Sequence, residues 1–415
     1  LEMERTTMQK KNNKYWNEKL TNIMPWGSST GSKSPNYSPE EPSVIVRGEG
    51  CRIWDADGRE FIDYKNGLGP ISLGYQFPAV NDAIREQLNQ GIVFGHPHPL
   101  ECEVAEMLSE IIPCAEQVRF LKTGGEALAA CIRIARYYTG RDHIVQIGYN
   151  GWLNSLATGA MILPRQAAIN APAGVPGCLS ELHHVGRWND MNLLEDIFER
   201  YEGQIAAVVV AADYADMESG KTFYPALREL TEEHGSLLIL DEIVTGFRIA
   251  MGGVQEYFDI VPDMSVFSKG MANGMPISAY VGKKDIMSKC DRGENLSVSS
   301  TFGGETLSLA AAKATIETYK REDVVAHLWK QGEKLWTDVN ELFESYNIPA
   351  AFKGLPPCPT IVIEEGENLL EKIFRAAFKN GISLYNVSYV NFSHKDRDIE
   401  ETLERFENAC KDIVS

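Results

Sequence analysis

Two short apolar runs stand out in the middle of the chain, and each is followed by a polar residue suited to catalysis. The runs cover residues 237–240 and 264–267; Asp241 comes directly after the first, and Lys269 comes two residues after the second. Apolar runs of this length predict strands buried on both faces, as in the parallel sheet of an α/β domain. Ligands of such sheets bind at the carboxyl ends of the strands, so Asp241 and Lys269 are predicted to meet in one site.

Strand and helix patterns alternate along most of the remaining chain. Further buried strands are predicted at residues 117–122, 144–147 and 205–212, and an Asp-Gly turn within residues 44–64 predicts a hairpin. The spacing of apolar residues predicts helices at 78–89, 100–112, 126–136, 226–234, 306–314, 323–346 and 398–413. Residues 1–43 are polar and predict an arm or loop outside the core, and residues 164–192 predict a loop-rich region. This alternation indicates an α/β fold.

Composition limits the kinds of partner. The 415 residues are 44% hydrophobic, which is ordinary for a globular protein and enough for a large core. The net charge of −18 disfavours nucleic acid, and no apolar run approaches the roughly 20 residues of a membrane helix. The eight cysteines are scattered, without the spacing of a metal site or a disulfide framework. Free thiols and the lack of a signal peptide predict a cytoplasmic protein without a metal.

A second candidate site follows the strand predicted at residues 117–122. The strand runs into Thr123, Gly124 and Gly125, and a strongly helical segment begins directly after them. A strand, a glycine turn and a helix start present backbone N–H groups and a positive helix end to a phosphate. A simple tight turn is the equally open alternative.

Together, an acid, a lysine and a phosphate turn are what pyridoxal phosphate requires. The lysine forms a Schiff base with the cofactor aldehyde, and the carboxylate keeps the pyridine nitrogen protonated. Tyr149, at the end of the strand predicted at 144–147, could stack on such a ring or fill the core. Taken singly, Asp241 could be a helix cap and Lys269 a solvated side chain.

Two motifs of nucleotide-binding proteins are present only in part. Gly220-Lys221-Thr222 resembles the end of a P-loop, but Ala215 stands where that motif needs glycine, and the Phe-Tyr-Pro sequence that follows predicts no helix there. The glycines at 124 and 125 lack the G-x-G-x-x-G spacing of a nicotinamide dehydrogenase.

Over nearly its whole length the chain resembles the class III aminotransferases, pyridoxal-phosphate enzymes of fold type I, and within them the glutamate-1-semialdehyde 2,1-aminomutase branch. The resemblance is carried by IMPWG (23–27), GCRIWDADG (50–58), LKTGGEA (121–127), YNGW (149–152), LRELTEEHG (227–235), LLILDEIVTGFR (237–248), SKGMANGMPISAYVG (268–282), STFGGE (300–305) and FSHKDRDIEETL (392–403). It implies a large cofactor-binding domain at 65–318 with a mostly parallel seven-stranded sheet. Residues 1–64 and 319–415 would form a smaller α+β domain.

The resemblance also implies roles for single residues. Lys269 would be the Schiff-base lysine and would move the proton between the substrate carbon and the cofactor. The other cofactor contacts would be Asp241 at the pyridine nitrogen, Tyr149 and Ile243 on the two ring faces, Thr123, Gly124 and Gly125 around the phosphate, and Thr301 reaching the phosphate of a neighbouring subunit. The last contact implies a homodimer with composite active sites, acting on small-molecule amines and carbonyls.

Several positions depart from the aminomutase pattern. Lys33 stands where that branch has a carboxylate-binding arginine, and Asn386 where it has a glutamate. Lysine lacks the bidentate fork of arginine. Gly125 replaces a common hydroxyl residue of the phosphate turn, and Trp152 is a further candidate substrate contact. The resemblance therefore implies pyridoxal-phosphate-dependent amino-group transfer, with a true aminomutase or a non-catalytic binding subunit as alternatives.

Overall fold

The computed structural model describes residues 11–151, 153 and 174–415. Its main sheet has seven strands in the order β4 (Gln117–Leu121), β10 (Ser278–Gly282), β9 (Met264–Phe267), β8 (Leu237–Asp241), β7 (Ile205–Val210), β5 (His143–Ile147) and β6 (His183–Val185). Strand β10 is antiparallel to both neighbours, and all other pairs are parallel. The predicted mostly parallel seven-stranded sheet is confirmed.

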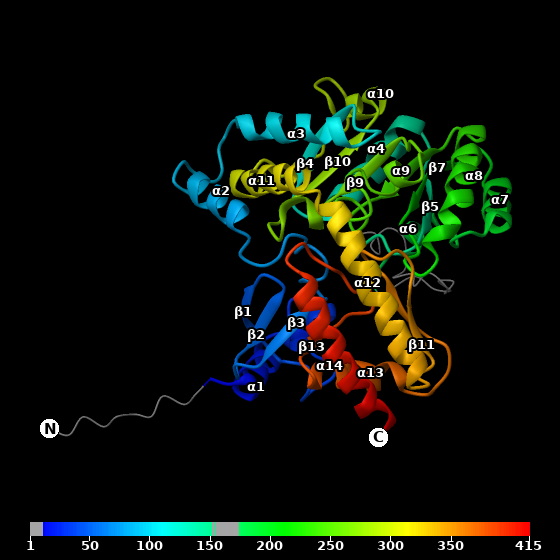
Figure 1. The fold of residues 1–415 in the computed structure, drawn as a ribbon. Helices are drawn as coiled ribbons and strands as arrows, with labels where there is room; N and C mark the ends of the chain where they lie inside the picture. Colours follow the sequence, from blue (N-terminus) through cyan, green and yellow to red (C-terminus); the bar gives the residue numbers. More distant parts are fainter. Residues whose placement is uncertain (1–10, 152, 154–173) are drawn as a thin grey trace.

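Helices cover both faces of this sheet (Figure 1). On one face, α4 (Gly124–Thr139) packs its apolar side against alternate residues of the strands, such as Ile144, Val209 and Ile239. Their neighbours in sequence, such as Val145 and Leu238, point to the other face. That face is covered by α2 (Pro78–Leu88), α3 (Pro99–Ile111), α7 (Met191–Arg200), α8 (Gly220–Glu233) and α11 (Thr306–Glu322). Burial on both faces explains the continuous apolar runs in the sequence.

Segments from the two ends of the chain combine in the lower part of Figure 1. A four-stranded sheet joins β1 (Ile45–Glu49), β2 (Arg52–Asp55) and β3 (Glu60–Asp63) to β13 (Ile382–Ser383), which runs parallel to β3. Its core packs Phe61 and Tyr64 against Phe374 and Phe406, residues more than 300 positions later in the chain. Around it lie α12 (Val324–Ser345), α13 (Leu369–Lys379), α14 (Asp396–Val414), β11 (Ala350–Lys353) and β12 (Thr360–Ile363). The division at residues 64 and 318 stays a prediction, and the second boundary would fall inside α11.

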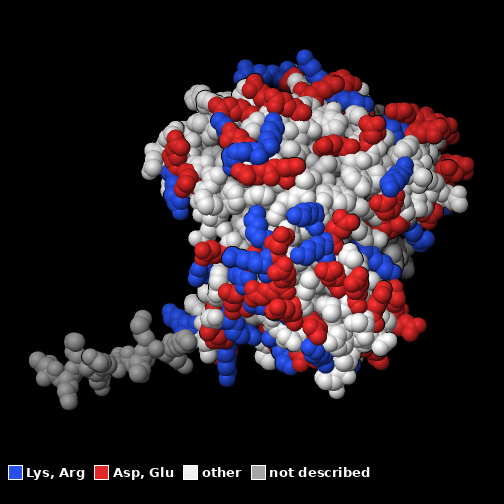
Figure 2. All heavy atoms as spheres, viewed as in Figure 1, with Lys and Arg blue, Asp and Glu red and all other residues white. Residues whose placement is uncertain are grey.

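The shorter elements complete the description. They are α1 (Asn13–Ile23), η1 (Pro25–Gly27), η2 (Gly31–Lys33), α6 (Gly177–Ser180), η3 (Met217–Ser219), α9 (Val254–Tyr257), η4 (Lys269–Ala272), α10 (Lys284–Met287) and η5 (Ser288–Cys290). Within the described ranges no helix is both long enough and apolar enough to cross a membrane. Figure 2 shows Lys and Arg interspersed with Asp and Glu on the visible face.

Two predicted loop regions contain secondary structure. The polar N-terminal segment forms α1, whose first residue, Asn13, is buried and donates from Nδ2 to Asp55 (2.9 Å) and Asp57 (2.9 Å). The segment is thus an arm that Asn13 ties to the end of β2 and the turn after it, with a helix that the sequence did not predict. Of the region 164–192 that was predicted to be loop-rich, residues 164–173 lie outside the described residues, and the rest holds the short elements α6 and β6 and the start of α7.

The helix predicted to begin at residue 226 begins earlier. Helix α8 starts at Gly220 and carries Pro225 in its interior, so the expectation that no helix follows the Gly-Lys-Thr sequence was wrong. Burial of Phe223 and Tyr224 offsets the cost of an interior proline. The P-loop pattern still fails, because Gly220 opens the helix instead of ending a phosphate loop.

Candidate active site

Asp241 and Lys269 lie at the same edge of the main sheet. Asp241 is the last residue of β8 and is in register with Val266 of the adjacent parallel strand β9. Lys269 opens η4 two residues after β9 ends, with a backbone φ of +34°. Such a left-handed conformation is costly for a residue other than glycine and is commonly found at functional sites. The structure thus brings both residues to the carboxyl ends of adjacent strands, where the charge of each affects the pKa of the other.

The carboxyl group of Asp241 is buried, and its hydrogen bonds and the nearby charge of Lys269 only partly offset the cost of burying its negative charge. Burial raises its pKa to about 6, against the lowering effects of the Ile243 N–H (3.1 Å), the Asn150 side-chain amide (3.2 Å) and the charge of Lys269. A cationic ring nitrogen beside Asp241 would supply the missing compensation. Asn150 was missed by sequence reasoning; its signal was its place directly after Tyr149 at the end of β5.

Burial lowers the pKa of Lys269, whereas it raises that of Asp241. It lowers the pKa of the amine to about 8, with Asp241 raising that pKa and Arg248 lowering it further. An amine with this pKa is uncharged in an appreciable fraction of molecules near neutral pH. An uncharged amine is the form that can attack a carbonyl carbon or accept a proton.

The phosphate turn has the predicted strand–turn–helix form. Thr123 caps α4: its hydroxyl accepts from the Glu126 N–H (3.3 Å), and the Glu126 carboxylate accepts from the Thr123 N–H (2.8 Å). Gly124 and Gly125 then open the helix, where their N–H groups have no preceding helical carbonyl to bind. A Cβ on Gly124 would lie 2.3 Å from Cδ1 of Ile243, so a larger residue there would displace the Ile243 side chain.

Two apolar contacts predicted for the cofactor ring lie near Asp241. Tyr149 follows β5 and is 52% exposed; burial and then the charge of Asp241 raise the pKa of its phenol. Ile243 leans from the turn after β8 over Gly124. The two residues therefore lie in the neighbourhood of Asp241, and their stacking roles stay predictions.

The predicted substrate and intersubunit residues Lys33, Asn386 and Thr301 are exposed. Lys33 is exposed at the end of η2, and Thr301 is exposed before α11. Asn386 is exposed too, and its backbone oxygen accepts from Ile361 N (3.0 Å) and Thr360 Oγ1 (3.2 Å). In the described part of the chain, no hydrogen bond or ion pair joins these three residues to Asp241 or Lys269. Trp152 lies outside the described residues.

The donor set fits the predicted cofactor. Gly124 and Gly125 offer N–H groups and a helix start to a phosphate, the buried Asp241 suits a protonated ring nitrogen, and Lys269 supplies the amine. Among the residues that the structure describes, no cluster of three or more His, Cys, Asp or Glu side chains could hold a metal ion.

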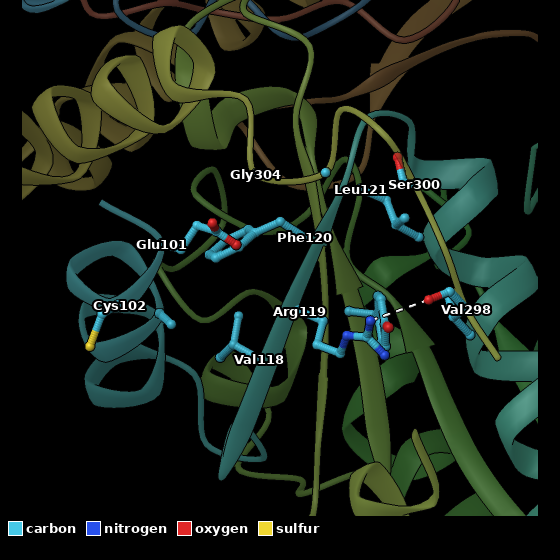
Figure 3. Close-up of a pocket in the computed structure, with 12 residues that line it drawn as sticks. Glu101, Cys102, Val118, Arg119, Phe120, Leu121, Val298, Ser300 and Gly304 are labelled. Atoms are coloured by element: carbon cyan, nitrogen blue, oxygen red, sulfur yellow. Dashed lines mark hydrogen bonds between the residues drawn. The ribbon is translucent and has the colours of Figure 1, made fainter. Parts of the chain in front are cut away.

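A separate cavity of about 360 Å³ lies along the edge strand β4 (Figure 3). It is bounded by α3 with Glu101 and Cys102, by β4 itself, and by the segment of residues 298–304. Arg119 donates across it to the backbone oxygen of Val298 (3.2 Å). Ser300, which lines the cavity, directly precedes Thr301, the residue predicted to act in a neighbouring subunit.

Comparison with known proteins assigns the family. The family model for aminotransferase class-III matches residues 34–410, so the chain belongs to the class III aminotransferases. It is 32% identical over 395 residues to a glutamate-1-semialdehyde 2,1-aminomutase of Persephonella marina, covering 90% of this chain and 92% of that protein. It is 31% identical over 410 residues to a 3-aminobutyryl-CoA aminotransferase of Cloacimonas acidaminovorans, covering 95% and 96%.

The fold is shared with solved structures. One is a transaminase with PLP bound, which superposes with a TM-score of 0.88 over 98% of this chain and 99% of that one, at 24% identity. This similarity confirms the fold type predicted from the sequence. The two relatives above have different activities at nearly equal identity, so identity alone does not select a substrate.

Proposed function

We propose that the protein transfers amino groups between small-molecule amines and carbonyl compounds, with Lys269 and Asp241 as its catalytic pair. The family membership makes it a pyridoxal-phosphate-dependent aminotransferase or aminomutase. The observation that carries the assignment of residues is the pairing of a lysine amine with a pKa lowered to about 8 and a buried carboxyl at the ends of adjacent strands.

Each residue of the pair would have one task. When bound, pyridoxal phosphate supplies an aldehyde that captures the substrate amine and a ring that withdraws electrons from the breaking bond. Asp241 would keep the ring nitrogen protonated, and Lys269 would take the proton from the substrate carbon and return it as general base and acid. Gly124 and Gly125 would hold the phosphate through their N–H groups.

Product analysis separates a transaminase from an aminomutase. The holoenzyme is incubated with single amines, carboxylated and neutral, with and without an added keto acid, and products are measured by mass spectrometry. A transaminase exceeds one turnover per site only when the keto acid is present. Repeated isomerisation of one amine without an acceptor would instead establish the aminomutase. If no amine gives either a carbonyl product or an isomer, the proposed transfer is wrong.

Lys33 is proposed to bind a substrate carboxylate. It is exposed on η2, and an ammonium–carboxylate hydrogen bond is worth roughly 1.5 kcal/mol at the low end. Lys33→Ala is therefore expected to raise KM for carboxylated amines about tenfold and to leave neutral amines unchanged. Lys14→Ala, which removes another exposed lysine, is the control. Equal changes for charged and neutral amines would exclude this role.

The protein is proposed to act as a homodimer. Thr301 is followed by Phe302, which is 55% exposed, and the nearby Ile92, Val93 and Phe94 are exposed as well. The two segments are joined by a hydrogen bond from Thr306 N to Ile92 O (2.9 Å). Contiguous exposed apolar side chains indicate a surface that is covered in the working protein. A second copy placed there would bring its Thr301 to the neighbouring site.

Phe302→Asp tests the dimer. A charge at the centre of an apolar interface costs several kcal/mol, so the variant is expected to be monomeric at micromolar concentration and to bind the cofactor more weakly. Sedimentation velocity measures the first effect and equilibrium dialysis the second. Val414→Asp is the matched control, because Val414 is also 55% exposed and lies at the chain end. A monomeric wild-type protein would contradict the proposal.

A further inference from the structure

Arg248 is completely buried close to the candidate site and has no assigned role there. It lies seven residues after Asp241, in the turn that follows β8. Its Nε donates to the backbone oxygen of Val244 (3.1 Å) and its Nη2 to that of Gly69. Nη1 is buried without a hydrogen-bond partner in the described part of the chain, and no carboxylate there forms an ion pair with the guanidinium. Burying a cation without a counterion costs free energy, so the position of Arg248 needs an explanation in the structure or function of the site.

The backbone that Arg248 holds is part of the wall around Lys269. Gly69 belongs to the segment of residues 65–73, in which Leu68 has a φ of +77°. That segment contacts the lysine segment directly: Ser72 Oγ donates to Gly270 O (3.2 Å), and Leu73 N donates to Asn273 Oδ1 (2.9 Å). Arg248 therefore stabilises the position of residues 65–73, a strained segment that lies against η4.

The turn carrying Arg248 touches η4 from a second side. A Cβ on Gly270 would lie 3.4 Å from Cβ of Phe247 and 3.5 Å from the backbone oxygen of Gly246. The Phe247 oxygen is fixed by the hydroxyl of Tyr319 (2.6 Å). Gly270, which follows Lys269, therefore packs on Gly246 and Phe247, which precede Arg248. A movement of the guanidinium would thus shift the backbone next to Lys269.

A third segment covers the guanidinium. The ring centroid of Tyr389 lies 4.5 Å from Cζ of Arg248. Tyr389 is itself fixed at both backbone groups, its N–H to Tyr64 O (2.8 Å) and its oxygen from Asn66 Nδ2 (2.7 Å). Arg248 thus ties together the turn after β8, the segment around Gly69 and the C-terminal segment, which come from distant parts of the sequence.

The charge of Arg248 also acts on Lys269. The groups whose charges affect the lysine amine are Asp241, Arg248 and Cys358. Burial raises the pKa of Cys358 to about 11, and the pKa of the nearby Tyr149 phenol lies above its usual value of 10. Near pH 8 those two groups are neutral, so Asp241 and Arg248 are the charged groups that oppose each other at Lys269.

We propose that Arg248 is a positioning residue that holds the segment of residues 65–73 against η4 and opposes the positive charge of the Lys269 amine. The proposal rests on the assigned role of Lys269 in amino-group transfer. It goes beyond that role because it gives Arg248 a task that acts through the backbone and the charge next to Lys269.

The test measures Lys269 in the cofactor-free protein. Acylation by a small anhydride is followed against pH by mass spectrometry of the peptide that contains Lys269, with the exposed Lys284 as internal standard. The wild-type midpoint is expected near 8. In Arg248→Met the midpoint is expected to rise by about one pH unit, because one opposing charge is removed. An unchanged midpoint in a folded Arg248→Met protein would overturn the electrostatic part.

Arg248→Lys distinguishes the effect of the positive charge from the effect of the hydrogen bonds to the backbone. It also gives a second variant to measure if Arg248→Met does not fold. It keeps the positive charge but cannot hold both carbonyl groups with a planar fork. Its labelling midpoint is expected to stay within about 0.3 units of wild type, while kcat falls about tenfold and KM changes little. Full kcat in Arg248→Lys would overturn the anchoring part. A protein without transferase activity but with the expected labelling shifts would refute the proposed function and leave the inference about Lys269 standing.

Discussion

Lys269→Ala is expected to lower the rate of amino-group transfer by at least about 10³-fold. General acid–base catalysis alone contributes about 10²–10⁴-fold, and the variant also loses the covalent attachment of the cofactor. The phosphate turn and Asp241 are untouched, so the variant should still bind pyridoxamine phosphate. Single-turnover measurements with a responsive amine give the rate, and fluorescence titration gives the binding.

Two controls make the Lys269 result specific. Lys284→Ala removes an exposed lysine on α10 and is expected to leave kcat unchanged. Adding a small primary amine to Lys269→Ala should restore part of the rate, because the free amine can replace the missing base. Wild-type activity in Lys269→Ala would show that another lysine performs the chemistry. Failure of the variant to bind pyridoxamine phosphate would show that the substitution disturbed the site as a whole.

Asp241→Asn is expected to reduce kcat/KM by about 10²–10³-fold, the usual cost of removing one preorganised electrostatic contact. Asparagine keeps the shape of the side chain but cannot balance a protonated ring nitrogen. The pH dependence follows from the pKa of about 6: the carboxyl takes up a proton as pH falls through this value. Cofactor affinity of the wild type should therefore weaken below about pH 6, and this loss should be absent in Asp241→Asn. Equilibrium dialysis from pH 5 to 8 measures both proteins.

Glu242 supplies the matched control for Asp241. It is the next residue and is equally buried, but its carboxylate accepts from Val254 N (2.9 Å) and Gln255 N (3.1 Å), away from the site. Glu242→Gln is expected to lower the free energy of unfolding by about 1–3 kcal/mol and to leave kcat/KM within a few-fold of wild type. Similar losses of activity in both variants would mean that Asp241 acts through stability alone.

The central strands, and the placement of Asp241 and Lys269 at their ends, could be predicted because the signals are local. Residues 237–240 and 264–267 are apolar runs that end beside functional groups, and burial on both faces of a parallel sheet produces such runs directly. The phosphate turn was equally visible, since Thr123 and the glycines stand between a strand pattern and a helix pattern. The roles given to Tyr149, Ile243 and Thr301 stay predictions.

Contacts between distant segments could not be predicted from local patterns. Asn150 reaches Asp241 across 91 positions, and Arg248 reaches Gly69 across 179. The polar helix α1 is fixed by Asn13 bonding to Asp55 and Asp57, which no periodicity in residues 1–43 indicates. Strand β6 is too short for any pattern, with three residues of which two are histidines. These features depend on the folded arrangement and not on neighbouring residues in sequence.

The most direct test of the central claim is to identify the residue that carries the cofactor. The purified protein is incubated with pyridoxal phosphate and reduced with borohydride, which fixes the link between the cofactor and its lysine. Peptide mass spectrometry then locates the added group. We expect it on Lys269, at close to one per chain, and absent from Lys269→Ala. A cofactor fixed on a different lysine, or on none, would contradict the assignment of this site.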